Sequence, residues 1–209
     1  MTGPAHPVPL AARLAFTAWM LVWVPIILVE AGPQNFWWLC NVALFLVLWA
    51  SWRPNRLMIS SQAGTVVLVG VVWTLDLAIG FALGDSPTGI TAYMFDPDFP
   101  PIRRFASSYH LWFPVYVVWL CLRLGYDRRG PWLQGVIGTL AILGGAWFGA
   151  PERNLNYSHA PFGIEQTLLP DPLYLVVLCL ATALLVYWPG HLVVRRLHRT
   201  FRARQASFR

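Results

Sequence analysis

Three polar side chains, Asn41, Asp76 and His110, interrupt three separate apolar segments of this chain. They lie in the sequences FWWLCNVALFL, VVLVGVVWTLDLAIGFAL and FASSYHLWFP, in that order. An acid beside a histidine stabilises the imidazolium that forms when the ring accepts a proton, and an amide can donate to an oxyanion. We therefore expect His110 to act as a general base, Asp76 to orient it and Asn41 to donate to an oxyanion.

The sequence leaves the nucleophile of such a reaction open. Cys40 directly precedes Asn41, and Ser107 and Ser108 lie just before His110. We name Cys40 as a fourth catalytic candidate, with either serine or an activated water as alternatives. The same polar residue types also join membrane helices through hydrogen bonds, so each candidate has a purely structural alternative.

Candidates for substrate contacts lie beside these segments. The stretch PERNLNYSHAPFGIEQTLLPDP directly follows an apolar segment, and residues 84–104 form a second irregular stretch with four prolines. Loops on the same side as a polar layer can cover it, although a solvated charged loop is the alternative. The residues that we expect to contact substrate are Glu152, Arg153, Asn154, His159 and Trp112.

The composition defines the elements that must position these residues. Hydrophobic residues make up 57% of the 209-residue chain, charged residues only 11%, and the mean hydropathy is +0.54. Crossing a bilayer requires about 20 apolar helical residues, and continuous runs of this kind exclude a barrel of alternating strands. The candidate segments are about residues 10–31, 35–52, 64–83, 105–124, 131–149 and 172–194. The sequence predicts an all-α polytopic membrane protein, with six transmembrane helices in a single domain spanning 1–209.

The orientation follows from the basic residues, all 15 of which are arginine. If the helices alternate, only Arg103, Arg104 and Arg153 lie on one side, and the others, including the tail 195–209, lie on the opposite side. Short cytoplasmic loops retain basic residues, so we expect both termini to be cytoplasmic in a multi-pass protein of the cell membrane, such as the bacterial inner membrane. This bias also accounts for the net charge of +6, which makes nucleic acid a poor partner and membrane lipids the expected one.

The same topology predicts the depth of the three polar side chains. Asn41, Asp76 and His110 lie roughly five to seven residues from the outer ends of their segments, or about 7–11 Å at the helical rise per residue. They would therefore share one layer and form an outward-facing polar pocket.

Metal and cofactor chemistry has little support in the sequence. No H-E-x-x-H motif and no pair of C-x-x-C motifs is present, so we expect no metal and no cofactor. The three cysteines, Cys40, Cys121 and Cys179, all lie inside predicted helices, where buried free thiols are the simplest interpretation.

Several stretches also carry a resemblance to known families. FWWLCNVALFL, WTLDLA, TAYMFDPDFP, YHLWFPVYVVWLCLRLGYDRRG and PERNLNY, within about residues 35–195, resemble a family of bacterial six-helix proteins described only as membrane-associated proteins. More remotely, a polar residue in the second helix and a histidine in the fourth are similar to the YwaF-like and androgen-induced lipid-hydrolase families. The hydrolases use an intramembrane Thr and His on lipid esters. The resemblance implies Cys40 or Asn41 at the nucleophile position, where this chain has no Thr, and His110 as the base.

Two classes of function follow, with a redox or metal protein as a third. The first is an intramembrane enzyme that hydrolyses or transfers the acyl group of a lipid or amphiphilic ester. The second is a non-enzymatic membrane protein, a small carrier or an assembly factor, in which the same residues form a structural or proton-linked network. The two classes differ in whether the polar side chains meet in an open pocket or are packed shut.

Overall fold

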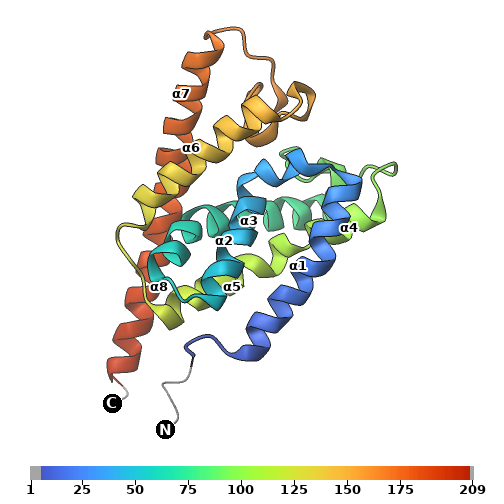
Figure 1. Cartoon of the computed structure of the whole chain (residues 1–209). Coiled ribbons are helices and arrows are strands. Elements are labelled where there is room, and N and C mark those ends of the chain that lie inside the picture. The colour runs from blue at the N-terminus through green and yellow to red at the C-terminus, as the bar shows by residue number, and fades with distance from the viewer. Residues whose placement is uncertain (1–5, 208–209) are drawn as a thin grey trace.

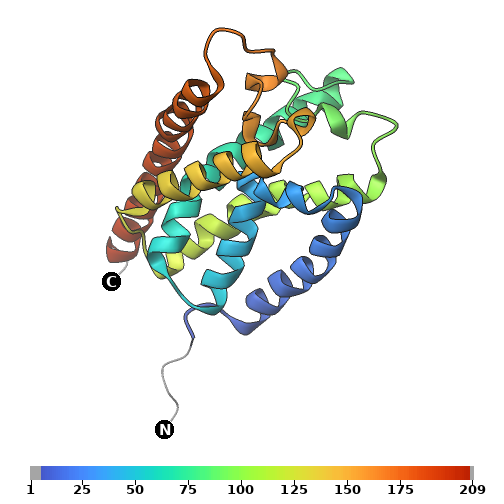
Figure 2. The same cartoon turned by 45° about the horizontal axis from the view of Figure 1, so that its top comes forward.

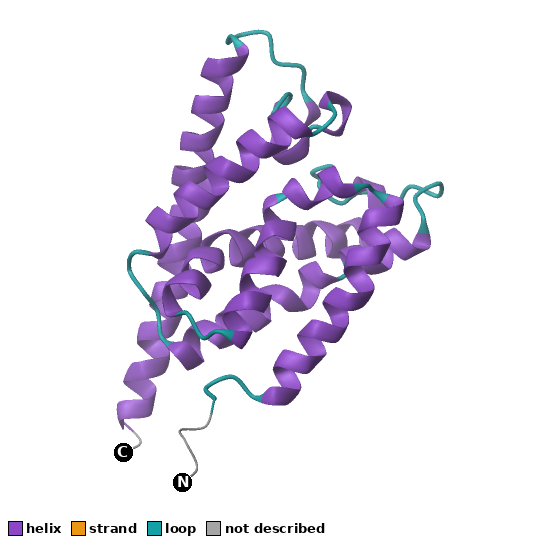
Figure 3. Ribbon diagram, viewed as in Figure 1, coloured by secondary structure: helices purple, strands orange, loops and turns teal. Residues whose placement is uncertain are grey.

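The protein is a bundle of helices, and residues 6–207 are described in the computed structural model (Figure 1). Helices and loops make up this part of the chain, which contains no strand (Figure 3). The helices are α1 (Leu10–Glu30), α2 (Leu39–Trp52), α3 (Arg56–Leu83), α4 (Pro101–Ser107), α5 (Tyr109–Leu124), α6 (Gly130–Phe148), α7 (Asp171–Thr182) and α8 (Trp188–Ser207). The prediction of an all-helical protein is confirmed.

Five helical stretches of the described chain are long and apolar enough to cross a membrane. They are α1, α3, α4 with α5, α6, and α7 with α8; α2 is shorter, with 14 residues. Between α7 and α8 the helix widens into a π-helical turn, Ala183–Tyr187, and continues. The residues predicted as a basic tail after 194 are therefore helical up to Ser207.

The predicted start of two helices was wrong. The second helix begins at Leu39 rather than near 35, because the extended backbone of Trp38 separates it from the 3-10 turn Pro33–Trp37. The third begins at Arg56 rather than 64, because the Asn55 side chain accepts a hydrogen bond from the Met58 N–H at 2.9 Å and caps the helix. The predicted fourth helix is divided at Ser108 into α4 and α5.

Helix α3 lies in the middle of the bundle and is contacted by α2, α5, α6 and α8 (Figure 2). Its glycines allow this close packing. A Cβ at Gly70 would lie 2.2 Å from the Pro114 ring of α5, and a Cβ at Gly64 would lie 2.6 Å from the His191 ring of α8. Small residues at helix contacts let backbones approach closely, which is how membrane helices gain packing energy.

The bundle has two different ends. At the end that we call the arginine-rich end (residues 6–9, 53–55, 125–129 and 195–207), Arg123 donates to the Pro7 carbonyl, and α1 begins and α8 ends at this end of the bundle (Figure 1). At the opposite end, which we call the loop end (31–38, 84–100 and 149–170), Asn156 bonds to the Leu39 N–H and to the Trp37 carbonyl. The connections of the bundle therefore alternate between the two ends.

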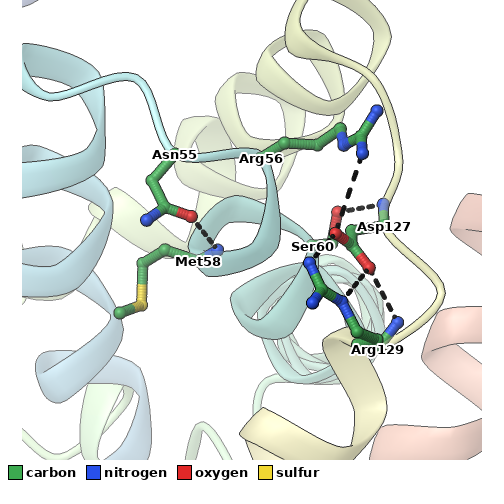
Figure 4. A network of polar contacts seen from close by, with 6 residues as sticks. All are labelled: Asn55, Arg56, Met58, Ser60, Asp127 and Arg129. Carbon is green, nitrogen blue, oxygen red and sulfur yellow. Dashed lines mark hydrogen bonds and ion pairs between the residues drawn. The ribbon is translucent and has the colours of Figure 1, made fainter.

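A network of charges joins α3 and α6 at the arginine-rich end (Figure 4). Asp127 accepts two hydrogen bonds from the Arg129 guanidinium, at 3.1 and 2.9 Å, and lies 3.9 Å from Arg56. The backbone N–H of Asp127 donates to Ser60 at 2.9 Å. Hydrogen bonds from Arg129 lower the pKa of Asp127 from 3.8 to about 2.

Candidate functional site

A cavity of about 490 Å³ lies between the helices at the loop end. This volume is within the usual range for a site that binds a small molecule. Helices α1 to α5 and both long loops contribute to its walls, which combine aromatic rings with a few polar groups. The lining residues are Trp23, Ile27, Asn35, Trp38, Cys40, Asn41, Val69, Trp73, Ile90, Tyr93, Phe99, Arg103, Ala106, Ser107, Tyr109, His110, Arg153, Leu155 and Tyr157.

His110 lines this cavity from the first turn of α5. Its Nδ1 lies 2.9 Å from the Ser107 carbonyl oxygen, which can only accept, so Nδ1 carries the proton and Nε2 of the neutral ring has a free lone pair. The ring stacks on Trp73 with centroids 4.8 Å apart and on Tyr109 at 4.0 Å. Nε2 has no hydrogen-bond partner in residues 6–207. The imidazole is thus oriented, and it can accept a proton.

Asn41 and Cys40 line the same cavity from the first turn of α2. The Asn41 carbonyl oxygen accepts from the Tyr109 hydroxyl at 2.8 Å, and its amide donates to the Asn35 carbonyl at 2.8 Å. One amide hydrogen of Asn41 is left for another acceptor. The Cys40 thiol lies 3.9 Å from the Asn41 carbonyl oxygen. The structure therefore brings three of the four predicted catalytic residues to one cavity.

Asp76 is the exception, and the expected pair with His110 does not form. Its carboxylate accepts five hydrogen bonds from the loop after α3: from the Ser86 hydroxyl and from the N–H and hydroxyl groups of Thr88 and Thr91, at 2.5 to 3.0 Å. These donors are neutral, and they satisfy both oxygens. Asp76 is outside the cavity lining, but it fixes the loop that contributes Ile90, Tyr93 and Phe99 to that lining.

Among the residues predicted to contact substrate, only Arg153 lines the cavity. The side chain of Asn154 bonds to the backbone of His159 and Ala160 and so folds its own loop. Trp112 packs against Phe16 and Trp19 of α1, with ring centroids 5.6 and 5.5 Å away.

Glu152 and His159 also lie outside the lining. Within the described residues 6–207, no group of three His, Cys, Asp or Glu side chains is placed to hold a metal ion.

Sequence reasoning missed Arg103 as a lining residue. It also missed the three tyrosines Tyr93, Tyr109 and Tyr157. One signal could have revealed Arg103: it is one of only three arginines on the side where the positive-inside rule expects few, and the cavity uses two of these three. The tyrosines carry no such signal, because aromatic residues are common at membrane interfaces.

Comparisons of the chain with protein-family models, with curated proteins and with solved structures find no match. The resemblance to membrane-associated proteins and to lipid hydrolases therefore stays a prediction. The chemistry of the cavity is the remaining guide to function.

Proposed function

We propose that the protein is an intramembrane enzyme that hydrolyses an ester bond of a lipid or another amphiphile, with His110 as the general base. The observation that carries this proposal is the state of His110. Its Nδ1 is held by the Ser107 carbonyl, and its unpaired Nε2 belongs to a residue that lines a cavity of substrate size. A lipid substrate suits a cavity between helices of which several can cross a membrane.

The reaction uses water as the attacking group. Nε2 of His110 accepts a proton from the water while its oxygen bonds to the ester carbonyl carbon. The carbonyl oxygen becomes negative, and the free amide hydrogen of Asn41 can donate to it. When the carbon–oxygen ester bond breaks, the leaving oxygen takes the proton from Nε2. The products are a carboxylic acid and an alcohol, and His110 returns to its neutral form.

Orientation of His110 does not require an acid in this arrangement. The Ser107 carbonyl fixes the tautomer, and the rings of Trp73 and Tyr109 fix the plane of the imidazole. A carbonyl dipole stabilises an imidazolium less than a carboxylate does, so we expect a slower enzyme than one with an acid–histidine pair.

The proposed setting is a multi-pass protein of the bacterial inner membrane, with the loop end facing outward. The arginine distribution supports this orientation, since the loop end has only Arg103, Arg104 and Arg153. Both ends of the chain would then be cytoplasmic.

The test is lipid profiling of membranes from cells that express the protein or His110→Ala. We expect ester lipids to be converted to acids and alcohols with the unmodified protein, and the rate to fall by about 10²- to 10⁴-fold in the variant. His198→Ala, which removes a histidine on the last helix, is the matched control and should keep full activity. Cys40→Ala should also remain active if water attacks directly, and inactivity of a folded Cys40→Ala would instead assign the nucleophile to the thiol.

A non-enzymatic carrier or assembly factor is the second candidate. It is favoured by the partners of Asp76 and Asn41, which have hydrogen bonds typical of a structural network. If the membrane lipids stay unchanged both with the folded unmodified protein and with His110→Ala, this second function is favoured.

A further inference from the structure

Two arginines, Arg103 and Arg153, line the cavity, while none of its lining residues is acidic. Arg103 comes from α4 and Arg153 from the loop after α6, so two distant parts of the chain bring positive charge to one space. Within the described residues, the ion pairs are those of Asp127 with Arg56 and Arg129, at the opposite end of the bundle. The two cavity arginines therefore have no carboxylate partner there.

Neutral contacts hold both guanidinium groups in position. The Arg103 guanidinium lies over the Phe99 ring, 4.5 Å from its centroid, and Arg153 donates from Nη1 to the Ala31 carbonyl. A guanidinium has five N–H donors in a planar fork, so these contacts leave most of the donors unused. Such contacts orient the arginines without neutralising them.

The electrostatics of the pair favour an anion. The positive charge of Arg153 repels that of Arg103. Glu30 attracts Arg103, but Glu30 is exposed and forms no ion pair with it. Uncompensated charges near hydrocarbon are costly, and an anion that binds both arginines would offset this cost. The rest of the wall is apolar near Trp23, Ile27 and Leu155, which suits the carbon chain next to a headgroup.

We infer that the cavity binds the anionic headgroup of an amphiphile, a phosphate or carboxylate, through Arg103 and Arg153. The guanidinium fork matches the two oxygens of such a group. This inference names the substrate class of the proposed hydrolase, and in that respect it rests on the proposed function. The anion-binding site itself depends only on the two arginines and the cavity.

The experiment measures binding to the purified full-length chain in detergent micelles. Three probes are titrated: a lipid with an anionic phosphoglycerol headgroup, a zwitterionic phosphocholine lipid with the same acyl chains, and inorganic phosphate. Tryptophan fluorescence reports on occupancy, because Trp23, Trp38 and Trp73 line the cavity. We expect the anionic lipid to bind at least tenfold more tightly than the zwitterionic lipid, and inorganic phosphate to bind far more weakly than either.

The variants assign this preference to the cavity. Arg103→Gln and Arg153→Gln together should abolish the preference for the anionic lipid, and Arg103→Lys should reduce it partly, because Lys keeps the charge but loses the fork. Arg104→Gln is the matched control, since Arg104 is on the same helix but outside the lining. It should behave like the unmodified protein, which separates the loss of a cavity arginine from the loss of any positive charge at the loop end.

Two results would overturn the inference. One is a double variant that unfolds like the unmodified protein and keeps the same preference for anionic lipid. The other is inorganic phosphate that binds as tightly as the anionic lipid, which would exclude an amphiphile as the ligand. His110→Ala should still bind the lipid, because the anion site does not include His110. If the unmodified protein binds anionic lipid but hydrolyses none, the proposed function has failed and the anion site stands. If it hydrolyses lipid with no preference for an anionic headgroup, the present inference has failed and the hydrolase stands.

Discussion

Charged side chains have different partners at the two ends of the bundle. At the arginine-rich end, Asp127 accepts from Arg129 and lies close to Arg56, so opposite charges meet and compensate one another. At the loop end, Asp76 is bound by hydroxyl and backbone N–H donors, while Arg103 and Arg153 contact a ring and a carbonyl. Negative and positive groups of the loop end are therefore kept apart. The difference indicates that charges compensate one another at one end and that the other end keeps two cations available.

The largest expected effect concerns which side of the membrane each end faces. Single cysteines placed at the exposed Asp98 and Glu165 should react almost completely with a membrane-impermeant thiol reagent applied to intact cells, while a cysteine at Arg128 should react only after the membrane is opened. The three native cysteines lie within helices and provide the background. The reverse pattern would place the cavity on the cytoplasmic side.

Removal of the Asp76 carboxylate should destabilise the protein strongly. Asp76→Ala removes the acceptor of the buried Thr91 N–H and hydroxyl, and also of the Ser86 hydroxyl and both Thr88 donors. A buried donor that is left unsatisfied costs about 1–3 kcal/mol. We expect a loss of at least about 3 kcal/mol in the free energy of unfolding. Thermal unfolding in detergent measures this loss, and proteolysis within residues 84–100 should become faster.

Asp76→Asn sharpens the comparison, because it removes the charge but keeps the shape. Both carboxylate oxygens accept a backbone N–H, so the amide nitrogen of Asn must face one of these donors, and we expect a cost of about 1–3 kcal/mol. Asp98→Asn, an exposed change in the loop that Asp76 holds, should have no effect. If Asp76→Asn kept full stability but lost hydrolysis, the result would support an acid–histidine pair, which the structure does not contain.

The smallest effect should come from Asp127 at the opposite end. Its folded-state pKa of about 2 lies below the ordinary value of 3.8, so its stabilising effect is present above pH 4 and is lost as the pH falls towards 2. Because the partner side chains are 74% and 58% exposed, we expect Asp127→Asn to cost only about 1 kcal/mol near neutral pH. Unfolding of both proteins between pH 2 and 7 should show the difference vanishing in acid. A constant difference would show that the ion pairs contribute nothing.

Much of the fold could be predicted from the sequence, because apolar runs of membrane length leave little choice. The errors lie where local backbone chemistry decides. The third helix was predicted to begin at 64, after the polar run Ser60, Ser61 and Gln62. Asn55 instead caps the helix before this run, and Gln62 donates to Gln134 of α6 at 3.0 Å. A polar run can belong to a helix when a neighbouring helix supplies its partners.

The candidate site could be predicted only in part. Depth counting placed Asn41 and His110 in one layer, since helical rise is regular, and both side chains line one cavity together with Cys40. It failed for Asp76, because depth does not specify which face a residue occupies, and because the Ser86, Thr88 and Thr91 donors follow the helix in a loop whose course has no periodicity. Arg103 was visible only as an exception to the charge bias.

The short α2 has a consequence for the surrounding bilayer. Its 14 residues span about 21 Å, against about 30 Å for the hydrocarbon core. The missing turns are replaced at the loop end by residues 31–38, in which the Ala31 and Trp37 carbonyls and the Gln34 side chain accept hydrogen bonds from the 149–157 loop. Such a hydrophobic mismatch makes the bilayer thinner beside a short helix. Lipid ester groups next to α2 would then lie deeper than elsewhere, at the level of its first turn, where Cys40 and Asn41 line the cavity.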